Sequence, residues 1–361
     1  MSIFHQAPDH IRAINAYVPG KPITELAREF GLEVNSIIKL ASNENPRGMS
    51  PKARAAVEAA LSGVALYPDQ FELVAKLAER LGVGREQIIL GSGSNDILDL
   101  AARAFLMPGR SAVSSQYAFP IYPISTLTAG GENIIVPAKG YGHDLDAMLA
   151  AIRPDTKLVW IANPNNPTGT FLAYDAVHAF MKRVPADVAV MLDEAYNEYL
   201  VPADRQESVA WIKEFPNLII TRTFSKVYGL AGLRVGFGVA SAEVADLLNR
   251  IRMPFNVNNL ALEAAKAALD DHEFLAESYV LNRKGMEQLV AGVKRLGLEH
   301  IPSHGNFVAV KVSDPQGINL KLLKQGVIVR PVGVPGFLRI TVGLPAENAR
   351  FLEALDKALH G

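Results

Sequence analysis

The most informative segment of the chain reads Thr221-Arg222-Thr223-Phe224-Ser225-Lys226-Val227-Tyr228-Gly229-Leu230-Ala231-Gly232-Leu233-Arg234. It lies between two apolar runs of strand length, 218–221 and 235–239, which places Lys226 in the connection that follows a strand. Small and apolar residues surround this lysine, and desolvation together with nearby cations lowers the pKa of an amine. A neutral amine can form a Schiff base with an aldehyde. Taken alone, such a segment more often holds a solvated loop lysine, so other motifs have to support the chemical interpretation.

Two other strand ends carry side chains of matching chemistry. The run Val190-Met191-Leu192-Asp193-Glu194-Ala195-Tyr196 places Asp193 at the end of a buried strand, with the Tyr196 phenol three residues further on. A carboxylate in that place can hold a pyridine nitrogen protonated. The run Asn163-Pro164-Asn165-Asn166-Pro167-Thr168-Gly169 ends another expected strand and offers an amide to a ring oxygen. Each run alone is a common turn, but the three in this order form a specific combination.

Strand and helix patterns alternate through the middle of the chain. We expect strands at residues 87–90, 111–114, 133–137, 158–162, 188–192, 218–221 and 235–239. Helical spacing of apolar residues lies between several of them, for example at 97–106 and 175–182. This alternation predicts an α/β fold, with a mostly parallel sheet covered by helices on both faces, that is, a three-layer domain. Ligands bind beyond the carboxyl ends of the strands in such sheets.

The pattern changes after about Arg252. Residues 259–269 and 274–296 are predicted to form long helices, followed by short strands at 307–312, 327–330 and 338–342 and a closing helix from Ala346. We therefore predict three parts: an N-terminal arm with part of the small domain at 1–44, a large cofactor-binding domain at 45–252, and a small α+β domain at 253–361.

Composition excludes several classes of protein. The length of 361 residues suits two packed domains, and 36 Lys+Arg against 37 Asp+Glu leave a net charge of −1, with no basic surface for nucleic acid. The absence of cysteine excludes thiolate catalysis, and the eight histidines form no pair at metal-ligand spacing, so we expect no metal. We see neither a signal peptide nor an apolar run long enough for a membrane, and expect a cytoplasmic enzyme.

The motifs together resemble those of the fold type I, pyridoxal-phosphate-dependent aminotransferases, and most closely those of the histidinol-phosphate aminotransferases. The matching positions run from Tyr17 to Pro345, nearly the whole chain. Beyond the three segments above they include Lys39–Pro46, Tyr67–Asp69, Gly91–Asp96, Pro254–Val257, Gly305–Phe307, Gly326–Pro331 and Leu338–Gly343. The resemblance implies the type I fold with pyridoxal 5'-phosphate as cofactor.

The resemblance implies roles around the cofactor ring. Lys226 is the Schiff-base lysine, and once released it moves the proton between the substrate carbon and the cofactor. Asp193 pairs with the pyridinium nitrogen, and Tyr196 and Asn166 form hydrogen bonds to the ring oxygen. Tyr117 stacks on the face of the ring.

A second group of residues is implied to hold the cofactor phosphate. Ser94 and Asn95 stand at an expected helix start, where free N–H groups and the helix dipole favour an anion. Thr223, Ser225 and Arg234 complete this cradle. Tyr67 is implied to reach the same phosphate from a second subunit, which makes the active unit a homodimer.

The substrate anchors are expected in the small domain. An arginine fork binds carboxylate or phosphate in bidentate fashion, and Arg330 and Arg339 lie at or near two strand ends. By resemblance Arg339 takes the α-carboxylate of glutamate, both arginines hold the phosphate of histidinol phosphate, Tyr17 adds a hydroxyl, and Asn45 also contacts substrate. The implied reaction interconverts L-glutamate and 3-(imidazol-4-yl)-2-oxopropyl phosphate with 2-oxoglutarate and L-histidinol phosphate, in histidine biosynthesis.

Two segments depart from the family pattern and leave the substrate open. Arg47–Pro51 replaces a turn that more often holds an aromatic or apolar residue, and the loop 331–337 between the two arginines is short. An aromatic amino-acid aminotransferase with the same cofactor chemistry is therefore an alternative, because exchanging imidazole for phenyl needs only a modest change of pocket. A decarboxylase of an amino-acid phosphate is a further alternative.

Overall fold

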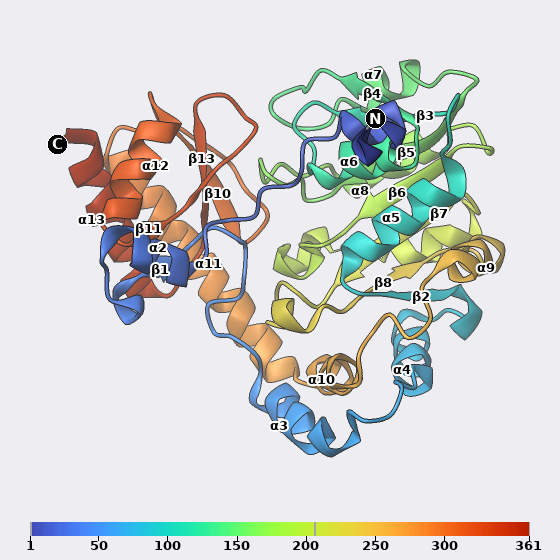
Figure 1. Ribbon diagram of the computed structural model, residues 1–361, viewed down its shortest axis with the longest axis horizontal. Helices are drawn as coiled ribbons and strands as arrows, with labels where there is room; N and C mark the ends of the chain where they lie inside the picture. The colour runs from blue at the N-terminus through green and yellow to red at the C-terminus, as the bar shows by residue number, and fades with distance from the viewer. Residues whose placement is uncertain (1, 206, 361) are drawn as a thin grey trace.

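The computed structural model describes residues 2–205 and 207–360, which form a large α/β part and a smaller α+β part (Figure 1). The large part contains a seven-stranded sheet of order β2-β8-β7-β6-β5-β3-β4, in which β8 is antiparallel to both neighbours and the other pairs are parallel. The strands are β2 (Ile88–Gly91), β3 (Ser111–Ser115), β4 (Glu132–Val136), β5 (Thr156–Ala162), β6 (Ala189–Asp193), β7 (Leu218–Thr223) and β8 (Gly236–Val239). The predicted, mostly parallel sheet is confirmed.

Helices cover both faces of this sheet because its strands are apolar on both sides. Along β5, Trp160 packs with the helices of one face, whereas Val159 and Ile161 belong to the core cluster of the opposite face. The first face carries α5 (Ser94–Phe105), α6 (Ile121–Thr128) and α9 (Ala242–Ile251). The opposite face carries α4 (Phe71–Leu81), α7 (Leu145–Ala150), α8 (Tyr174–Met181) and α10 (Asn259–Leu269), with α3 (Pro51–Ala60) packed on α10. The three predicted layers are therefore present.

The small part is built on an antiparallel sheet of order β12-β13-β10-β9. Its strands are β9 (His300–Ile301), β10 (Phe307–Lys311), β12 (Arg330–Pro331) and β13 (Phe337–Thr341), and its helices are α11 (His272–Arg295), α12 (Pro315–Lys324) and α13 (Pro345–His360). The single strand predicted at 327–330 is instead two strands, because β11 (Val327–Ile328) pairs with β1 (Ile38–Lys39) while β12 pairs with β13.

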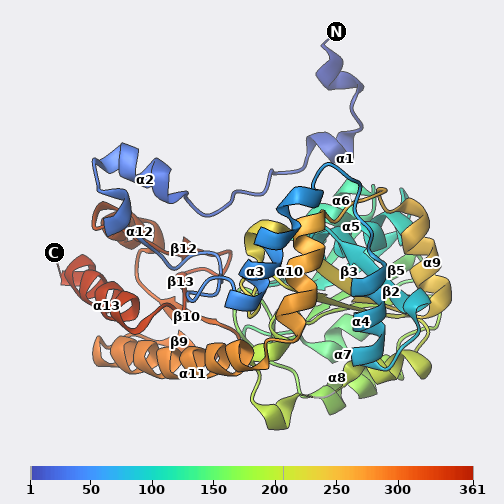
Figure 2. The same cartoon turned by 90° about the horizontal axis from the view of Figure 1, so that it is seen from below.

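The N-terminal segment joins both parts of the molecule. Helix α2 (Ile23–Phe30) packs on the small part, where Leu26 shares a core cluster with Leu323 and Ile328. The short helix α1 (Asp9–Arg12) contacts α6 of the large part, and the chain between α1 and α2 crosses from one part to the other (Figure 2).

The predicted boundary after Arg252 does not match the packing. It would assign α10 to the C-terminal domain, but Leu262 and Ala265 of α10 belong to the same core cluster as Val190 of β6. The buried Leu289 of α11, by contrast, belongs to the core of the small part. We therefore propose that the large part extends to about residue 271. Among the described residues, no helix has both the length and the apolar character needed to cross a membrane.

Candidate active site

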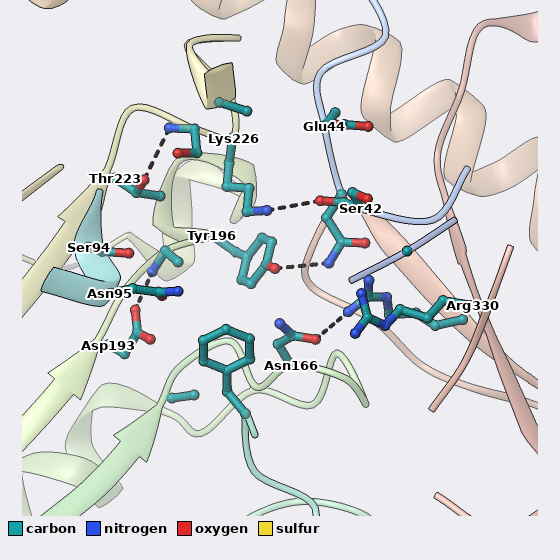
Figure 3. Close-up of a pocket in the computed structure, with 18 of the residues that line it drawn as sticks. Ser42, Glu44, Ser94, Asn95, Asn166, Asp193, Tyr196, Thr223, Lys226 and Arg330 are labelled. Carbon is teal, nitrogen blue, oxygen red and sulfur yellow. Dashed lines mark hydrogen bonds between the residues drawn. The ribbon is translucent and has the colours of Figure 1, made fainter. Parts of the chain in front are cut away.

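One pocket brings together twelve of the fifteen predicted site residues. It opens where β5, β6 and β7 end, next to the start of α5, and β12 and β13 of the small part close its other side. The twelve residues are Tyr17, Ser94, Asn95, Asn166, Asp193, Tyr196, Thr223, Ser225, Lys226, Arg234, Arg330 and Arg339. Figure 3 shows Ser94 and Thr223 on one side of the pocket, Arg330 on the opposite side, and the amine of Lys226 directed into the space between them.

Lys226 follows β7, and its amine is directed into the pocket (Figure 3), with one hydrogen bond to the part of the chain that the structure describes. Nζ donates to the backbone carbonyl of Ser42 at 3.1 Å. Burial above all, together with the positive charges of Arg339 and Arg234, lowers the pKa of Lys226 to about 7, against the opposing effect of Glu44 and Asp193. A substantial fraction of this amine is therefore neutral near pH 7, as a nucleophile or general base requires.

Asp193 is the last residue of β6 and is only 6% exposed. Its Oδ2 accepts a hydrogen bond from the Tyr122 hydroxyl at 2.8 Å, and its Oδ1 accepts one from the backbone N–H of Ala195 at 3.2 Å. Burial raises the pKa of Asp193 to about 6, although both hydrogen bonds act in the opposite direction. A buried carboxylate with a raised pKa facing a pocket is suited to pair with a cation from a ligand.

Tyr196 and Asn166 both keep a donor free for a ligand. The Tyr196 oxygen accepts from Nδ2 of Asn43 at 2.9 Å, so its own hydrogen can point into the pocket, and burial raises the pKa of Tyr196 to about 12. The Asn166 oxygen accepts from Arg339 at 2.6 Å, which leaves the NH₂ group available.

The predicted phosphate end combines a helix start with two hydroxyls and a guanidinium. Ser94 begins the twelve-residue helix α5, whose cap Gly93 provides no side-chain hydrogen bond. Arg234 donates to the backbone oxygen of Ser92 at 3.4 Å and to the Ser225 hydroxyl at 3.4 Å. A Cβ on Gly93, whose φ is +82°, would lie 2.2 Å from this guanidinium, so glycine is required there. Free N–H groups and a cation together favour an anion.

Two arginines stand at the other end of the pocket. Arg339 is 6% exposed and donates to Asn166 and, at 2.6 Å, to the backbone carbonyl of Ala41, and burial lowers its pKa to about 10. Its Nε is buried and has no partner within the described residues. Arg330 donates to the carbonyl of Val18 at 2.8 Å and lies 5.1 Å from the ring centroid of Tyr17. These guanidinium groups keep donors that an anionic substrate can use.

Three predicted residues lie outside the pocket. Asn45 was expected to contact substrate; its amide donates to the carbonyl of Val227 at 2.7 Å and to the Ser278 hydroxyl at 3.0 Å, and its role toward substrate stays a prediction. Tyr117 was expected to stack on a cofactor ring, but it lies beside the pocket, 6.3 Å from Tyr141 in a stacked arrangement. Tyr67 is 80% exposed on the surface.

Among the pocket residues without a role in the sequence interpretation, three carry an aromatic ring or an amide. Phe119 lines the pocket, and we propose that it takes the ring-stacking role in place of Tyr117. Asn43 lies in the matched run 39–46, two residues before Asn45. Its φ of +55° interrupts the regular alternation of side chains along this run, so the sequence alone could not tell which of the two amides enters the pocket. Tyr122 offered no signal other than being one of several aromatic residues after β3.

Comparison with known proteins places the chain in a family. Residues 35–355 match the family "Aminotransferase class I and II". The chain belongs to the class I and II aminotransferases. This aminotransferase is 67% identical, over 99% of its length and all of the relative's, to histidinol-phosphate aminotransferase 1 of Dechloromonas aromatica. It is 61% identical to histidinol-phosphate aminotransferase 1 of Thiobacillus denitrificans, over 98% of this chain and 93% of that one.

A solved structure agrees with the arrangement of the elements. The histidinol-phosphate aminotransferase of Sinorhizobium meliloti, in complex with pyridoxal 5'-phosphate, matches this aminotransferase with a TM-score of 0.91 and 29% identity over 98% of both chains. The fold type I architecture and the family expected from the motifs are therefore confirmed.

Proposed function

We propose that this aminotransferase uses pyridoxal 5'-phosphate to interconvert L-glutamate and 3-(imidazol-4-yl)-2-oxopropyl phosphate with 2-oxoglutarate and L-histidinol phosphate, in histidine biosynthesis. The observation that carries the proposal is a lysine with a pKa of about 7 that shares one pocket with Asp193, Arg330 and Arg339. Two relatives of 67% and 61% identity, both named histidinol-phosphate aminotransferase, support the choice of substrate. The location in the cytoplasm stays a prediction.

The residues of the pocket suit this cofactor. The start of α5, with Thr223, Ser225 and Arg234, provides donors and positive charge for a phosphate. Asp193, when ionised, would hold the ring nitrogen protonated. When bound, the cofactor supplies an aldehyde that takes up amino groups and a ring that withdraws electrons from the bond being broken.

Lys226 and its neighbours handle the proton. Because the pKa of Lys226 is about 7, Nζ can accept a proton and return it without a large free-energy difference between the two states. The hydrogen bond to the carbonyl of Ser42 fixes the direction of the amine. Tyr196 remains protonated at neutral pH and can donate to the ring oxygen, together with the NH₂ group of Asn166.

The two arginines and Tyr17 suit substrates that differ in shape but share a terminal anion. Glutamate presents carboxylates and histidinol phosphate presents a phosphate, and a guanidinium can bind either through two parallel hydrogen bonds. Binding at this end would hold the reacting carbon in place, so that binding energy contributes to rate.

We further propose a homodimer in which Tyr67 completes the phosphate site of the partner. Support comes from an exposed apolar surface around Tyr67, which stacks on Phe255 with ring centroids 4.4 Å apart. Next to these two rings in the sequence, Val64, Leu66, Phe71 and Met253 are also exposed apolar residues. Exposed apolar groups of this size are typical of protein–protein interfaces.

A comparison of substrates tests the proposal. The purified enzyme is offered histidinol phosphate, phenylalanine and tyrosine separately with 2-oxoglutarate, and kcat/KM is compared. A strong preference for histidinol phosphate supports the proposal, whereas similar values favour an aromatic amino-acid aminotransferase. Release of CO2 from an amino-acid phosphate, without conversion of 2-oxoglutarate to glutamate, would instead indicate a decarboxylase.

A further inference from the structure

Tyr122 is a buried pocket residue whose hydroxyl is bonded to Asp193. The hydroxyl donates to Oδ2 of Asp193 at 2.8 Å, while the backbone N–H of Ala195 donates to Oδ1 at 3.2 Å. Each carboxylate oxygen therefore has one donor from the chain and keeps a lone pair for a ligand. We propose that Tyr122 is a positioning residue whose hydroxyl keeps the Asp193 carboxylate ionised and fixed toward the pocket. This inference rests on the proposed cofactor.

The ring of Tyr122 is held on several sides. Tyr122 lies in the first turn of α6, has no exposed surface, and stacks on Trp160 of β5 with centroids 5.1 Å apart and planes 4° from parallel. The indole of Trp160 donates in turn to the Thr126 hydroxyl of the same helix at 3.1 Å. Phe119 contacts the ring edge-on at 5.8 Å. Because the ring cannot swing, the hydroxyl has a fixed position relative to the end of β6.

The carboxylate needs such a donor because its surroundings disfavour its charge. Burial raises the pKa of Asp193, and the negative charge of Glu194 acts in the same direction. The Tyr122 hydroxyl, the N–H of Ala195 and the charge of Lys226 oppose this effect. Burial also raises the pKa of Tyr122 well above its ordinary value, so the phenol stays neutral and can only donate to the carboxylate.

A second buried tyrosine–carboxylate pair, outside the pocket, provides a control for the pair of Tyr122 and Asp193. The hydroxyl of Tyr174 donates to Oε1 of the buried Glu194 at 3.1 Å, one residue after Asp193, and neither residue lines the pocket. Tyr174→Phe removes the same group, also next to a buried carboxylate. It therefore reports the general cost of losing a buried phenol.

Binding of pyridoxal 5'-phosphate to cofactor-free protein tests the inference without depending on activity. The dissociation constant is measured for the wild type, Tyr122→Phe and Tyr174→Phe at about pH 6 and about pH 8.5. Loss of the Tyr122 hydroxyl raises the pKa of Asp193, so more of the carboxyl is protonated at the lower pH. We expect binding by Tyr122→Phe to weaken roughly tenfold at about pH 6 and only about twofold at about pH 8.5. Tyr174→Phe should stay within about twofold of the wild type at both.

A double variant checks that the effect passes through the carboxylate. In an Asp193→Asn background, which has no titrating group at this position, Tyr122→Phe should cause no additional pH-dependent loss. An equal loss at both pH values, no loss, or a loss that Tyr174→Phe reproduces would overturn the positioning role. If the wild type itself fails to bind the cofactor, the proposed function falls, and this inference falls with it.

Discussion

The two ends of the pocket are built in different ways. At the cofactor end, β6 ends at Asp193 and β7 ends at Thr223, and both strands belong to the same sheet. Ser94 begins α5, which packs on that sheet. At the substrate end, Arg330 and Arg339 come from the small sheet and are held by backbone carbonyls of Val18 and Ala41, far away in the sequence. Within one subunit, the groups of the first end stand on a single sheet of the large part, whereas the second end exists only when the small part and the N-terminal segment meet the large one.

This difference separates two kinds of function. Groups on adjacent strand ends keep fixed distances, as a cofactor that remains bound requires. Groups held across two domains and a connecting segment can accept different substrates in turn, here a carboxylate and a phosphate. Substitutions at the first end should therefore affect every substrate, and substitutions at the second end should discriminate between substrates.

The largest effect is expected at the cofactor end, from Lys226→Ala. Loss of the amine removes both the attachment point and the general base, so kcat should fall by at least about 10⁴-fold for every substrate. Borohydride treatment followed by peptide mapping should label residue 226 in the wild type and leave the variant unlabelled. Lys311→Ala, which removes a surface lysine paired with Glu299, is the control and should keep full activity. Near-normal turnover by Lys226→Ala would refute the role of this residue.

At the same end, Asp193→Asn should lower activity but raise the stability of the cofactor-free protein. Loss of the negative charge should lower kcat by about 10²–10³-fold for both half-reactions. Because the pKa of Asp193 is raised to about 6 in the folded protein, its ionisation costs stability as the pH rises from about 4 through 6. The cofactor-free variant should therefore be more stable than the wild type at about pH 8, by about 1–2 kcal/mol in urea denaturation. A variant that is less stable at that pH would contradict the assigned cost of the charge.

Arg330→Ala tests the substrate end. The variant should lose about 10²-fold in kcat/KM for histidinol phosphate and only a few-fold for glutamate, because the phosphate is expected to use both arginines. Arg339→Ala should impair both substrates, since this residue is expected to take the α-carboxylate as well. Half-reactions measured separately with each amino donor give the two ratios. Equal losses for both donors in Arg330→Ala would remove its phosphate-specific role.

The same contrast explains what could be predicted from the sequence. Strand ends with polar residues are local signals, so Lys226 and Asp193 were found, and the pocket brings them together with ten other predicted residues. The predicted sheet followed from apolar periodicity for the same reason. The later domain boundary that we propose could not be read from the sequence, because α10 has the composition of a generic apolar helix and only packing shows that Leu262 belongs to the large core.

Within the site, the differences between the predicted residues and the residues that line the pocket come from backbone turns that no pattern encodes. Between Asn43 and Asn45 the positive φ of Asn43 decides which amide reaches the pocket. After β3, the entry into α6 decides that Phe119 and Tyr122, but not Tyr117, line the pocket. Tyr67 lies beyond any test within a single chain, so its role across a dimer remains a prediction.

The smallest predicted effect links the two ends electrostatically. Besides burial, the positive charge of Arg339 is the largest influence that lowers the pKa of Lys226, whereas Arg330 is not among the leading influences on it. In the wild type, the rate at which cofactor-free protein takes up pyridoxal 5'-phosphate should rise with pH through about 7, because the neutral amine is the reactive form. Arg339→Gln should move the midpoint of this profile to higher pH by roughly half a unit or more, since the amine keeps its proton more easily without the neighbouring cation. Arg330→Gln is the matched control and should leave the midpoint in place. An unchanged midpoint in Arg339→Gln would show that burial alone tunes the lysine and that the substrate end has no electrostatic influence on the catalytic amine.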